Sequence, residues 1–449
     1  MRLFRRSPRF VRSLVASIPA VLLAGWAAQA TPLLVIDAKT GDVLIERDAT
    51  EPWYPASLTK LVTVYTALTA VREGRITLDT PLLVSRRAAS MPASKMGFRP
   101  GTEVTLDNAL KMLMVKSAND LAITIAEGVG GSVESFADQM NKVAAKIGMR
   151  ESHFVNPNGL HADGHYSSAR DMAVVGMALY RDFPEHSDLY GIGAFRLGSM
   201  IVPTHNGLMG RYPGAEGMKT GFTCPAGLNV VASATRGGRR LIAVVLGYPS
   251  AKERTIEAAK ILDAGFATGS TGRKVADLPT VAGGPPNMRD QVCGPHRKEI
   301  TEDDFAVRVA GAPAGPAKGA DEGNPLAFFR APEAASTASP IASDGVAATQ
   351  AAMATRPVFE PIDVYVGPAP GWTGGVAGPV GVTQQSAAAD ADEDDAKAAA
   401  AKPGKKGKRG KIAKAAPAKP APKAVEAKKT EPKKIAAHAP AKGKKTREN

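Results

Sequence analysis

Residues 55–60 read Pro55-Ala56-Ser57-Leu58-Thr59-Lys60, and the interpretation of the whole chain starts from this hexapeptide. Apolar residues recur at helical spacing from Pro55 to Thr69, which predicts a helix. Residues three apart share a helix face, so the Ser57 hydroxyl and the Lys60 amine are expected to point into one cleft. A lysine held neutral by burial or by nearby cations can accept the serine proton and make the serine a nucleophile. Taken alone, the pattern also fits a capping serine beside a solvated lysine.

A second motif, Ser117-Ala118-Asn119, occurs about 60 residues later, in a short break between helices expected at 106–115 and 119–127. The Ser117 hydroxyl can relay a proton to a leaving group, and the Asn119 amide can orient a substrate backbone. The alternative is a helix cap, because serine and asparagine are favoured at helix N-termini.

The third motif is Lys219-Thr220-Gly221, which precedes an apolar β-type run from Leu228 to Thr235. Gly221 leaves room for a substrate to lie along a strand edge, and its neighbours can pair with a peptide main chain. Lys219 would supply positive charge for a substrate carboxylate. The alternative is a surface turn. Serine-lysine on a helix, Ser-x-Asn in a loop and Lys-Thr-Gly on a strand, in this order, are together close to the signature of penicillin-recognising acyl-serine enzymes.

The surrounding pattern predicts one mixed α/β (α+β) body. Residues 33–46 read strand, turn, strand, and the apolar runs 228–235 and 240–246 flank a Gly-Gly hairpin signal. Helical patterns lie between these strands, and an amphipathic helix is expected at 252–266. We therefore expect a sheet assembled from both ends of the domain, accompanied by a helical subdomain, over residues 31–268.

This body resembles the D-alanyl-D-alanine carboxypeptidases of the low-molecular-mass penicillin-binding proteins. The resemblance covers a little over half of the chain. Beyond the three motifs it is carried by Gly159-Leu160, by Tyr166-Ser167-Ser168-Ala169-Arg170-Asp171-Met172-Ala173, by His205-Asn206-Gly207-Leu208 and by Gly227-Leu228-Asn229-Val230-Val231-Ala232-Ser233-Ala234. It implies the serine acyl-transferase fold shared by β-lactamases and DD-peptidases.

The resemblance also implies a reaction and a set of roles. Ser57 would attack the penultimate D-Ala carbonyl of a peptidoglycan stem peptide with Lys60 as base, and β-lactams would acylate Ser57 as mimics of the D-Ala-D-Ala end. Ser117 and Asn119 would take the relay and orienting roles. The terminal carboxylate would be held by Lys219 and Thr220, beside Gly221, and the oxyanion hole would be formed by the backbone N–H groups of Ser57 and Phe222.

Three other functions stay open at this point. A DD-endopeptidase acting on wall cross-links would use the same acyl-enzyme chemistry. A class A β-lactamase is less favoured, because no glutamate between Asn119 and Lys219 stands in a Glu-x-x-Leu-Asn setting. A non-catalytic wall-binding protein would not need the intact motifs. We expect no metal and no cofactor: His161 and His165 flank Asp163-Gly164, which predicts a loop, and no His-Glu-x-x-His occurs.

The two ends of the chain account for its basic character. The formal net charge is +14, but residues 397–449 carry +15 and residues 1–30 carry +5, so residues 31–396 carry −6. A basic body built around a nucleic-acid groove is therefore not expected. Arginines, an apolar run and Ala28-Gln29-Ala30 predict a signal peptide over residues 1–30, and hence an exported protein that is periplasmic or associated with the cell envelope.

The C-terminal part of the chain differs from the body in composition. Residues 269–396, rich in Ala, Pro and Gly, are expected to be a mostly disordered linker, and residues 397–449 a disordered cationic tail. The tail is either a solvated linker or a polycation for anionic wall polymer, lipopolysaccharide or lipid. Cys224 and Cys293, the only cysteines, are either a disulfide, which an oxidising compartment permits, or two free thiols.

Overall fold

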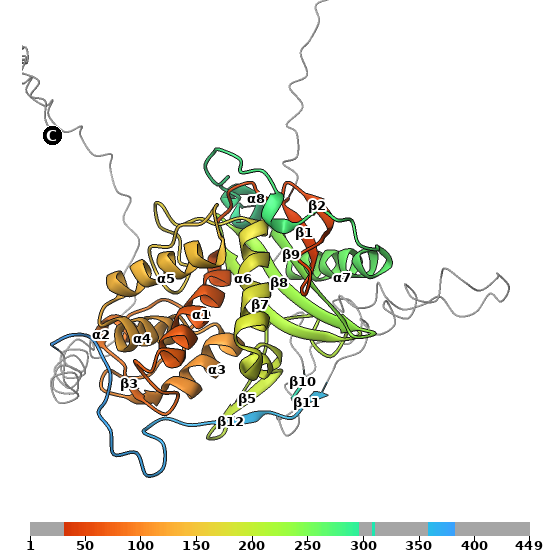
Figure 1. Ribbon diagram of the computed structural model, residues 1–449. Helices are drawn as coiled ribbons and strands as arrows, with labels where there is room; N and C mark the ends of the chain where they lie inside the picture. Colours follow the sequence, from red (N-terminus) through yellow and green to blue (C-terminus); the bar gives the residue numbers. More distant parts are fainter. Residues whose placement is uncertain (1–30, 296–307, 310–357, 382–449) are drawn as a thin grey trace, which may run out of the picture. The chain divides into compact units, whose positions relative to one another are not determined.

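The computed structural model describes residues 31–295, 308–309 and 358–381. A five-stranded antiparallel sheet, in the order β2-β1-β9-β8-β7, forms its centre (Figure 1). The strands are β1 (Leu33–Asp37), β2 (Val43–Arg47), β7 (Ala215–Thr223), β8 (Gly227–Arg236) and β9 (Arg239–Tyr248). Because β1 pairs with β9, Leu33 lying opposite Val245, the predicted sheet assembled from both ends of the domain is confirmed.

Both faces of this sheet are covered. In β1, Leu34 and Ile36 join one hydrophobic core, whereas Leu33 and Val35 join another. This alternation results from the period of two along a strand. Helix α7 (Ala251–Ala267) covers the second face through residues such as Leu262, and α6 (Ala169–Asp182) lies against the first. A strand buried on both faces reads as an apolar run, as residues 241–246 of β9 do, whereas β8 includes the buried polar residues Asn229 and Ser233.

The helical subdomain lies on the α6 side of the sheet (Figure 1). Its helices are α1 (Thr59–Arg72), α2 (Arg86–Ala89), α3 (Leu106–Lys116), α4 (Asn119–Gly130) and α5 (Val133–Ile147). The short 3-10 helix η1 (Ala56–Leu58) leads into α1, and β3 (Pro81–Leu83), which pairs antiparallel with β4 (Glu103–Thr105), packs against α4. Another 3-10 helix, η2 (Pro184–Gly191), leads from α6 to the hairpin β5 (Ala194–Leu197) with β6 (Met200–Pro203).

Described segments beyond Thr268 also pack against the body. Residues 269–295 contain η3 (Val275–Asp277) and α8 (Arg289–Cys293), and Val275 and Val292 are buried there. The structure joins Cys224 to Cys293 by a disulfide, which ties α8 to the end of β7. The linker that we expected to start at residue 269 therefore begins with residues that contact the core. The domain limit near residue 268 stays a prediction.

A later segment, residues 358–381, runs along the edge of the helical subdomain and is hereafter called the strap. It begins with β11 (Val358–Phe359), which pairs with β10 (Arg308–Val309), and continues with β12 (Ile362–Val364). Strand β12 lies parallel to β5, and the side chain of Val364 is buried. The backbone N–H of Ala377 then donates to the carbonyl of Pro81, in β3. Figure 1 shows this segment in blue, below β5 and β3.

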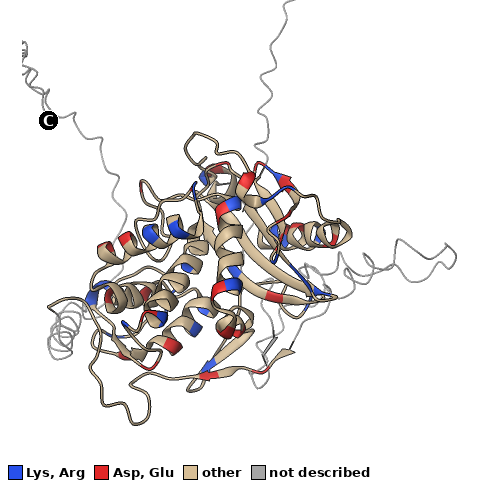
Figure 2. Ribbon diagram, viewed as in Figure 1, with Lys and Arg blue, Asp and Glu red and all other residues tan. Residues whose placement is uncertain are grey.

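Charged residues of both signs are interspersed over the described ribbon (Figure 2). Among the described residues, no helix has the length and apolar character needed to cross a membrane. The signal peptide, the cationic tail and most of the expected linker lie outside the described residues, and they stay predictions.

Candidate active site

Ser57 lies in η1, at the entrance to α1, and two glycines fix this turn against the rest of the domain. Ala56, the residue before it, has a positive φ of 49°. Gly159 also has a positive φ, and a Cβ there would lie 1.8 Å from the Ala56 carbonyl oxygen. A Cβ on Gly221 would lie 2.9 Å from the Pro55 carbonyl oxygen and 3.1 Å from the Ser57 backbone nitrogen. Backbones approach this closely only where a side chain is absent.

Lys60 is fully buried one helical turn after Ser57, and three oxygens surround its amine. Its Nζ lies 2.9 Å from Ser57 Oγ, 2.8 Å from Asn119 Oδ1 and 2.7 Å from the Asn158 carbonyl oxygen. Burial, reinforced by the charge of Lys219, holds the pKa of Lys60 well below its ordinary 10.5. Burial has this effect because it disfavours the charged form.

The hydrogen-bond partners of the Lys60 amine indicate which way its lone pair points. The oxygens of Asn119 and Asn158 are carbonyl oxygens and can only accept, so they take both N–H groups of a neutral amine. The Asn119 amide cannot be turned round, because its Nδ2 donates to the Pro92 carbonyl oxygen at 3.0 Å. In the neutral form of Lys60 the remaining lone pair would then face the Ser57 hydroxyl. This is the arrangement in which a lysine takes the proton of a serine.

Ser117 and Asn119 lie where α3 ends and α4 begins. Ser117 is the C-cap of α3 and adopts the left-handed conformation, with φ 61° and ψ 33°. This single residue turns the chain from one helix into the next, and it places Ser117 and Asn119 in the lining of the cleft that holds Ser57. The position of the second motif between two helices is as the sequence predicts.

Lys219, Thr220 and Gly221 lie on β7, which is the edge strand of the sheet. Its inner edge pairs with β8, Thr220 lying opposite Val230. The outer edge faces η1, as the close approach of Gly221 to Ser57 shows. The buried amine of Lys219 donates to the carbonyl oxygen of Thr220 at 3.0 Å.

A cleft of about 530 Å³ opens over these groups. It is lined by Ser57, Ala93, Ser94, Lys95, Lys116, Ser117, Asn119, Asn158, Gly159, Leu160, His205, Thr220, Gly221, Phe222 and Thr223. The predicted Ser57, Ser117, Asn119, Thr220, Gly221 and Phe222 are therefore together on one surface. Lys60 and Lys219 are buried and are not part of that lining.

Several residues of the cleft did not emerge from the motifs. The Asn158 carbonyl oxygen contacts Lys60. No sequence motif predicts this contact, because every residue has a main-chain carbonyl. Lys95 and Lys116 lie in the lining without belonging to a motif. His205 and Leu160 were noted only as part of the family resemblance, which was the one signal that could have located them.

The histidines His161 and His165 take different partners. The ring of His161 packs edge-on against Tyr54, with ring centroids 4.7 Å apart. His165 is buried; its Nδ1 accepts from the Val155 backbone N–H, and its Nε2 lies 2.8 Å from Thr59 Oγ1. Burial, followed by the charges of neighbouring groups, lowers the pKa of His165 to about 3, so the ring is neutral and Nε2 donates to Thr59. His165 thus supports the residue that begins α1.

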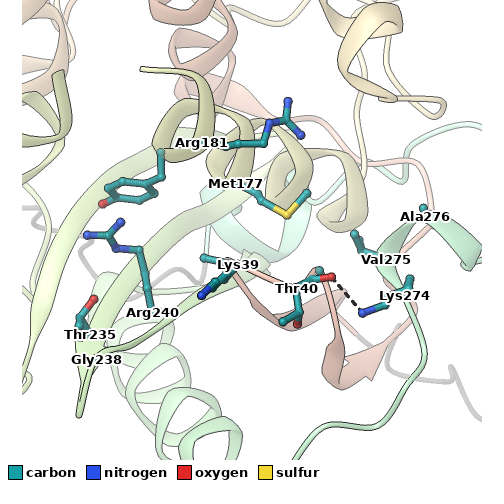
Figure 3. Close-up of a pocket in the computed structure, with 13 residues that line it drawn as sticks. Lys39, Thr40, Met177, Arg181, Thr235, Gly238, Arg240, Lys274, Val275 and Ala276 are labelled. Atoms are coloured by element: carbon teal, nitrogen blue, oxygen red, sulfur yellow. Dashed lines mark hydrogen bonds between the residues drawn. The ribbon is translucent and has the colours of Figure 1, made fainter. Parts of the chain in front are cut away.

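A second cavity, of about 760 Å³, lies between the β1–β2 turn, α6 and the β8–β9 hairpin (Figure 3). The cations in its lining are Lys39, Arg181, Arg240 and Lys274. The last three form ion pairs with neighbouring carboxylates at 2.5–2.7 Å. The lining of this cavity contains lysines but no serine that could serve as a nucleophile beside them. The smaller cleft, which holds Ser57 above the buried Lys60, is therefore the candidate active site.

Comparison with known proteins identifies related sequences. The sequence model of the D-alanyl-D-alanine carboxypeptidase family matches residues 20–250. The chain is 36% identical over 244 residues to the D-alanyl-D-alanine carboxypeptidase DacF of Bacillus subtilis, covering 54% of this chain and 63% of that protein. It is also 36% identical over 264 residues to DacC of Escherichia coli, covering 57% and 64%. The chain thus spans less than two thirds of the length of these relatives.

Solved structures show the same likeness. The D-alanyl-D-alanine carboxypeptidase DacD of Francisella tularensis is similar with a TM-score of 0.51 and 28% identity, covering 58% of this chain and 73% of that one. Penicillin binding protein 5 of Haemophilus influenzae has a TM-score of 0.51 and 36% identity, covering 53% and 71%. The family match extends over more than half of the chain and includes all three motifs of the cleft. This chain belongs to the D-alanyl-D-alanine carboxypeptidase family.

Proposed function

We propose that this protein is a serine-type D-Ala-D-Ala carboxypeptidase that removes the terminal D-Ala from peptidoglycan stem peptides through an acyl-enzyme on Ser57. The observation that carries the proposal is the buried Lys60 amine, whose Nζ lies 2.9 Å from Ser57 Oγ while two carbonyl oxygens occupy its N–H groups. Family membership and the names of the relatives support the choice of substrate.

Acylation begins when Lys60 takes the Ser57 proton and Oγ attacks the carbonyl carbon of the penultimate D-Ala. The negative charge that develops on the carbonyl oxygen would be stabilised by the backbone N–H groups of Ser57 and Phe222. The close approach of β7 to η1 supports this pairing. Preorganised donors of this kind lower a barrier by roughly 3–4 kcal/mol each.

Collapse of the tetrahedral intermediate breaks the bond to the terminal D-Ala. Ser117, in the cleft lining beside Asn119, would pass a proton to the departing amine. Lys219 and Thr220 would hold the carboxylate of the leaving D-Ala, since cations and hydroxyl donors bind carboxylates well. Water then attacks the ester, Ser57 regains its proton, and the shortened peptide leaves. β-Lactams would enter the same sequence by acylating Ser57.

We also propose that the protein is exported and acts in the cell envelope. The disulfide between Cys224 and Cys293 supports this location, because such bonds persist in oxidising compartments. Cleavage of a signal peptide after residue 30, and binding of anionic envelope polymers or lipids by residues 397–449, remain part of the proposal. Sedimentation of the full chain and of a chain ending at residue 381 with isolated envelope, at low and high salt, tests the role of the tail.

Two measurements on the purified full chain test the activity: D-Ala release from a peptide that ends in D-Ala-D-Ala, and labelling by a fluorescent penicillin. We expect both from the parent and neither from Ser57→Ala. Labelling without D-Ala release would indicate an endopeptidase, and rapid turnover of the penicillin would indicate a β-lactamase. A parent that reacts with neither would overturn the proposal.

A further inference from the structure

The candidate active-site cleft is lined by basic residues that have no role in the proposed reaction. Its lining contains Lys95, Lys116 and His205 but no aspartate or glutamate. Buried Lys219, together with Thr220, is already assigned to the carboxylate of the terminal D-Ala. The two lysines of the lining therefore have no role in the proposed acylation and hydrolysis steps.

Lys116 is the better placed of these two lysines to meet a ligand. It is half-buried at the last position of α3, directly before Ser117. Within the described residues no hydrogen bond or ion pair engages its side chain. Asp120 is close in sequence, but it is fully buried and accepts from the backbone N–H groups of Met96 and Gly97. Its carboxylate is therefore occupied by the backbone rather than by Lys116.

The wall that holds Lys116 is rigidly connected. The Ser94 hydroxyl donates to the Lys116 carbonyl oxygen at 2.8 Å, and the Asn119 backbone N–H donates to the Ser94 carbonyl oxygen at 2.8 Å. Lys95 lies on the same wall, where its amine donates to the carbonyl oxygen of Ala89, an uncharged group. The backbone that carries Lys116 is therefore held in place beside Ser117, and a ligand that reaches this wall would meet positive charge there.

The lining of the cleft also includes Thr220, Gly221, Phe222 and Thr223 of β7, which carry no charge. A peptide that adds to the outer edge of β7 directs successive side chains to opposite sides. Because Lys116 and these β7 residues line one cleft, a side chain of a peptide held on β7 can reach the Lys116 amine.

We propose that Lys116 is a specificity-determining residue that binds a carboxylate on the side chain of the stem-peptide residue just before the D-Ala pair. The inference rests on the proposed function and names the substrate class more narrowly: a stem peptide that is anionic at this position is preferred. Lys95 adds to the same positive field from the neighbouring segment. Lys116 takes no part in bond making or breaking.

The test uses the purified full chain and two peptides that differ only in the residue before D-Ala-D-Ala. One peptide has meso-diaminopimelate, which bears a side-chain carboxylate, and the other has L-Lys, which does not. We expect Lys116→Gln to lower the preference, measured as the ratio of the two kcat/KM values, by about fivefold, which is near the upper end for a partly exposed ion pair. The preference of the parent should weaken as salt is added.

Two further variants separate charge recognition from support of the helix. Lys116→Arg should restore the preference, because it keeps the charge. Lys111→Gln is the matched control on the same helix: Lys111 pairs with Asp107 and is absent from the cleft lining, so its loss should leave the preference unchanged. A fall in kcat/KM that is equal for both peptides, or an unchanged ratio in Lys116→Gln, would overturn the inference.

A second pair of probes keeps this inference distinct from the proposed function. Benzylpenicillin and carbenicillin differ by one side-chain carboxylate, and their acylation rates do not depend on D-Ala release. If the parent is acylated but cleaves neither peptide, the carboxypeptidase proposal fails while Lys116 is still tested. A selective loss of the carbenicillin rate in Lys116→Gln would support the inference, and equal rates for parent and variant with both compounds would refute it.

Discussion

Gly221→Ala is expected to slow acylation of Ser57 without unfolding the protein. The new Cβ would lie 2.9 Å from the Pro55 carbonyl oxygen and 3.1 Å from the backbone nitrogens of Ser57 and Leu58. Ordinary contacts start near 3.4 Å, so η1 or β7 must move by about 0.3–0.5 Å. A misplacement of 1 Å costs about a hundredfold in rate, so we expect a loss of about tenfold. Overpacking should also cost about 1–3 kcal/mol of stability.

The assay is the second-order rate of labelling by a fluorescent penicillin, measured beside a thermal unfolding curve that establishes that the variant is folded. Gly269→Ala is the matched control, because nothing lies within 4 Å of a Cβ at that position. It should change neither the rate nor the unfolding midpoint. A folded Gly221→Ala that is labelled at the parent rate would refute the view that contact between β7 and η1 sets the position of the nucleophile.

Three other changes test separate features. Lys60→Met should lower the acylation rate about a thousandfold, because the proton acceptor is lost. In the parent the acylation rate should rise with pH through a pKa below 10.5, since burial favours the neutral amine of Lys60. An acylation rate that does not depend on pH would contradict this. Replacing both Cys224 and Cys293 by Ser should lower the free energy of unfolding by up to about 4 kcal/mol in a denaturant titration, because the disulfide closes a long loop; an unchanged midpoint would count against it. Val364→Asp should cost about 2 kcal/mol in the same titration, because it buries a charge, whereas Val380→Asp, at a position 86% exposed, should change stability by less than about 0.5 kcal/mol. Equal losses in the two valine variants would mean that β12 is not held against β5.

The parts of the site that are local in sequence could be predicted. Ser57 and Lys60 are one helical turn apart, so helical spacing alone brings them together. The conformation of Ser117 could not be predicted, although its place between two helices could. Lys60 also contacts the carbonyl oxygen of Asn158, 98 positions away. This contact could not be predicted, because every residue has a main-chain carbonyl and the side chain of Asn158 takes no part in it.

The packing of the strap could not be predicted from the sequence either. Residues 358–381 are rich in Gly and Pro, which favours an interpretation as linker. In the structure they are held by backbone hydrogen bonds, such as that from Gly367 N–H to the Glu103 carbonyl oxygen, and by insertion of Val364. Main-chain pairing of this kind depends on which edge is available in the folded protein, and composition does not report it.

The pairing of β1 with β9 has a consequence for how the protein is made. Leu33 lies opposite Val245, so the central sheet cannot close until more than 200 further residues have left the ribosome. At about 5–20 residues per second this takes on the order of ten to forty seconds. Long-range strand pairing is also slow once the partners are present. During that interval the nascent chain has no closed sheet, which is compatible with the proposed export of the chain in an unfolded state.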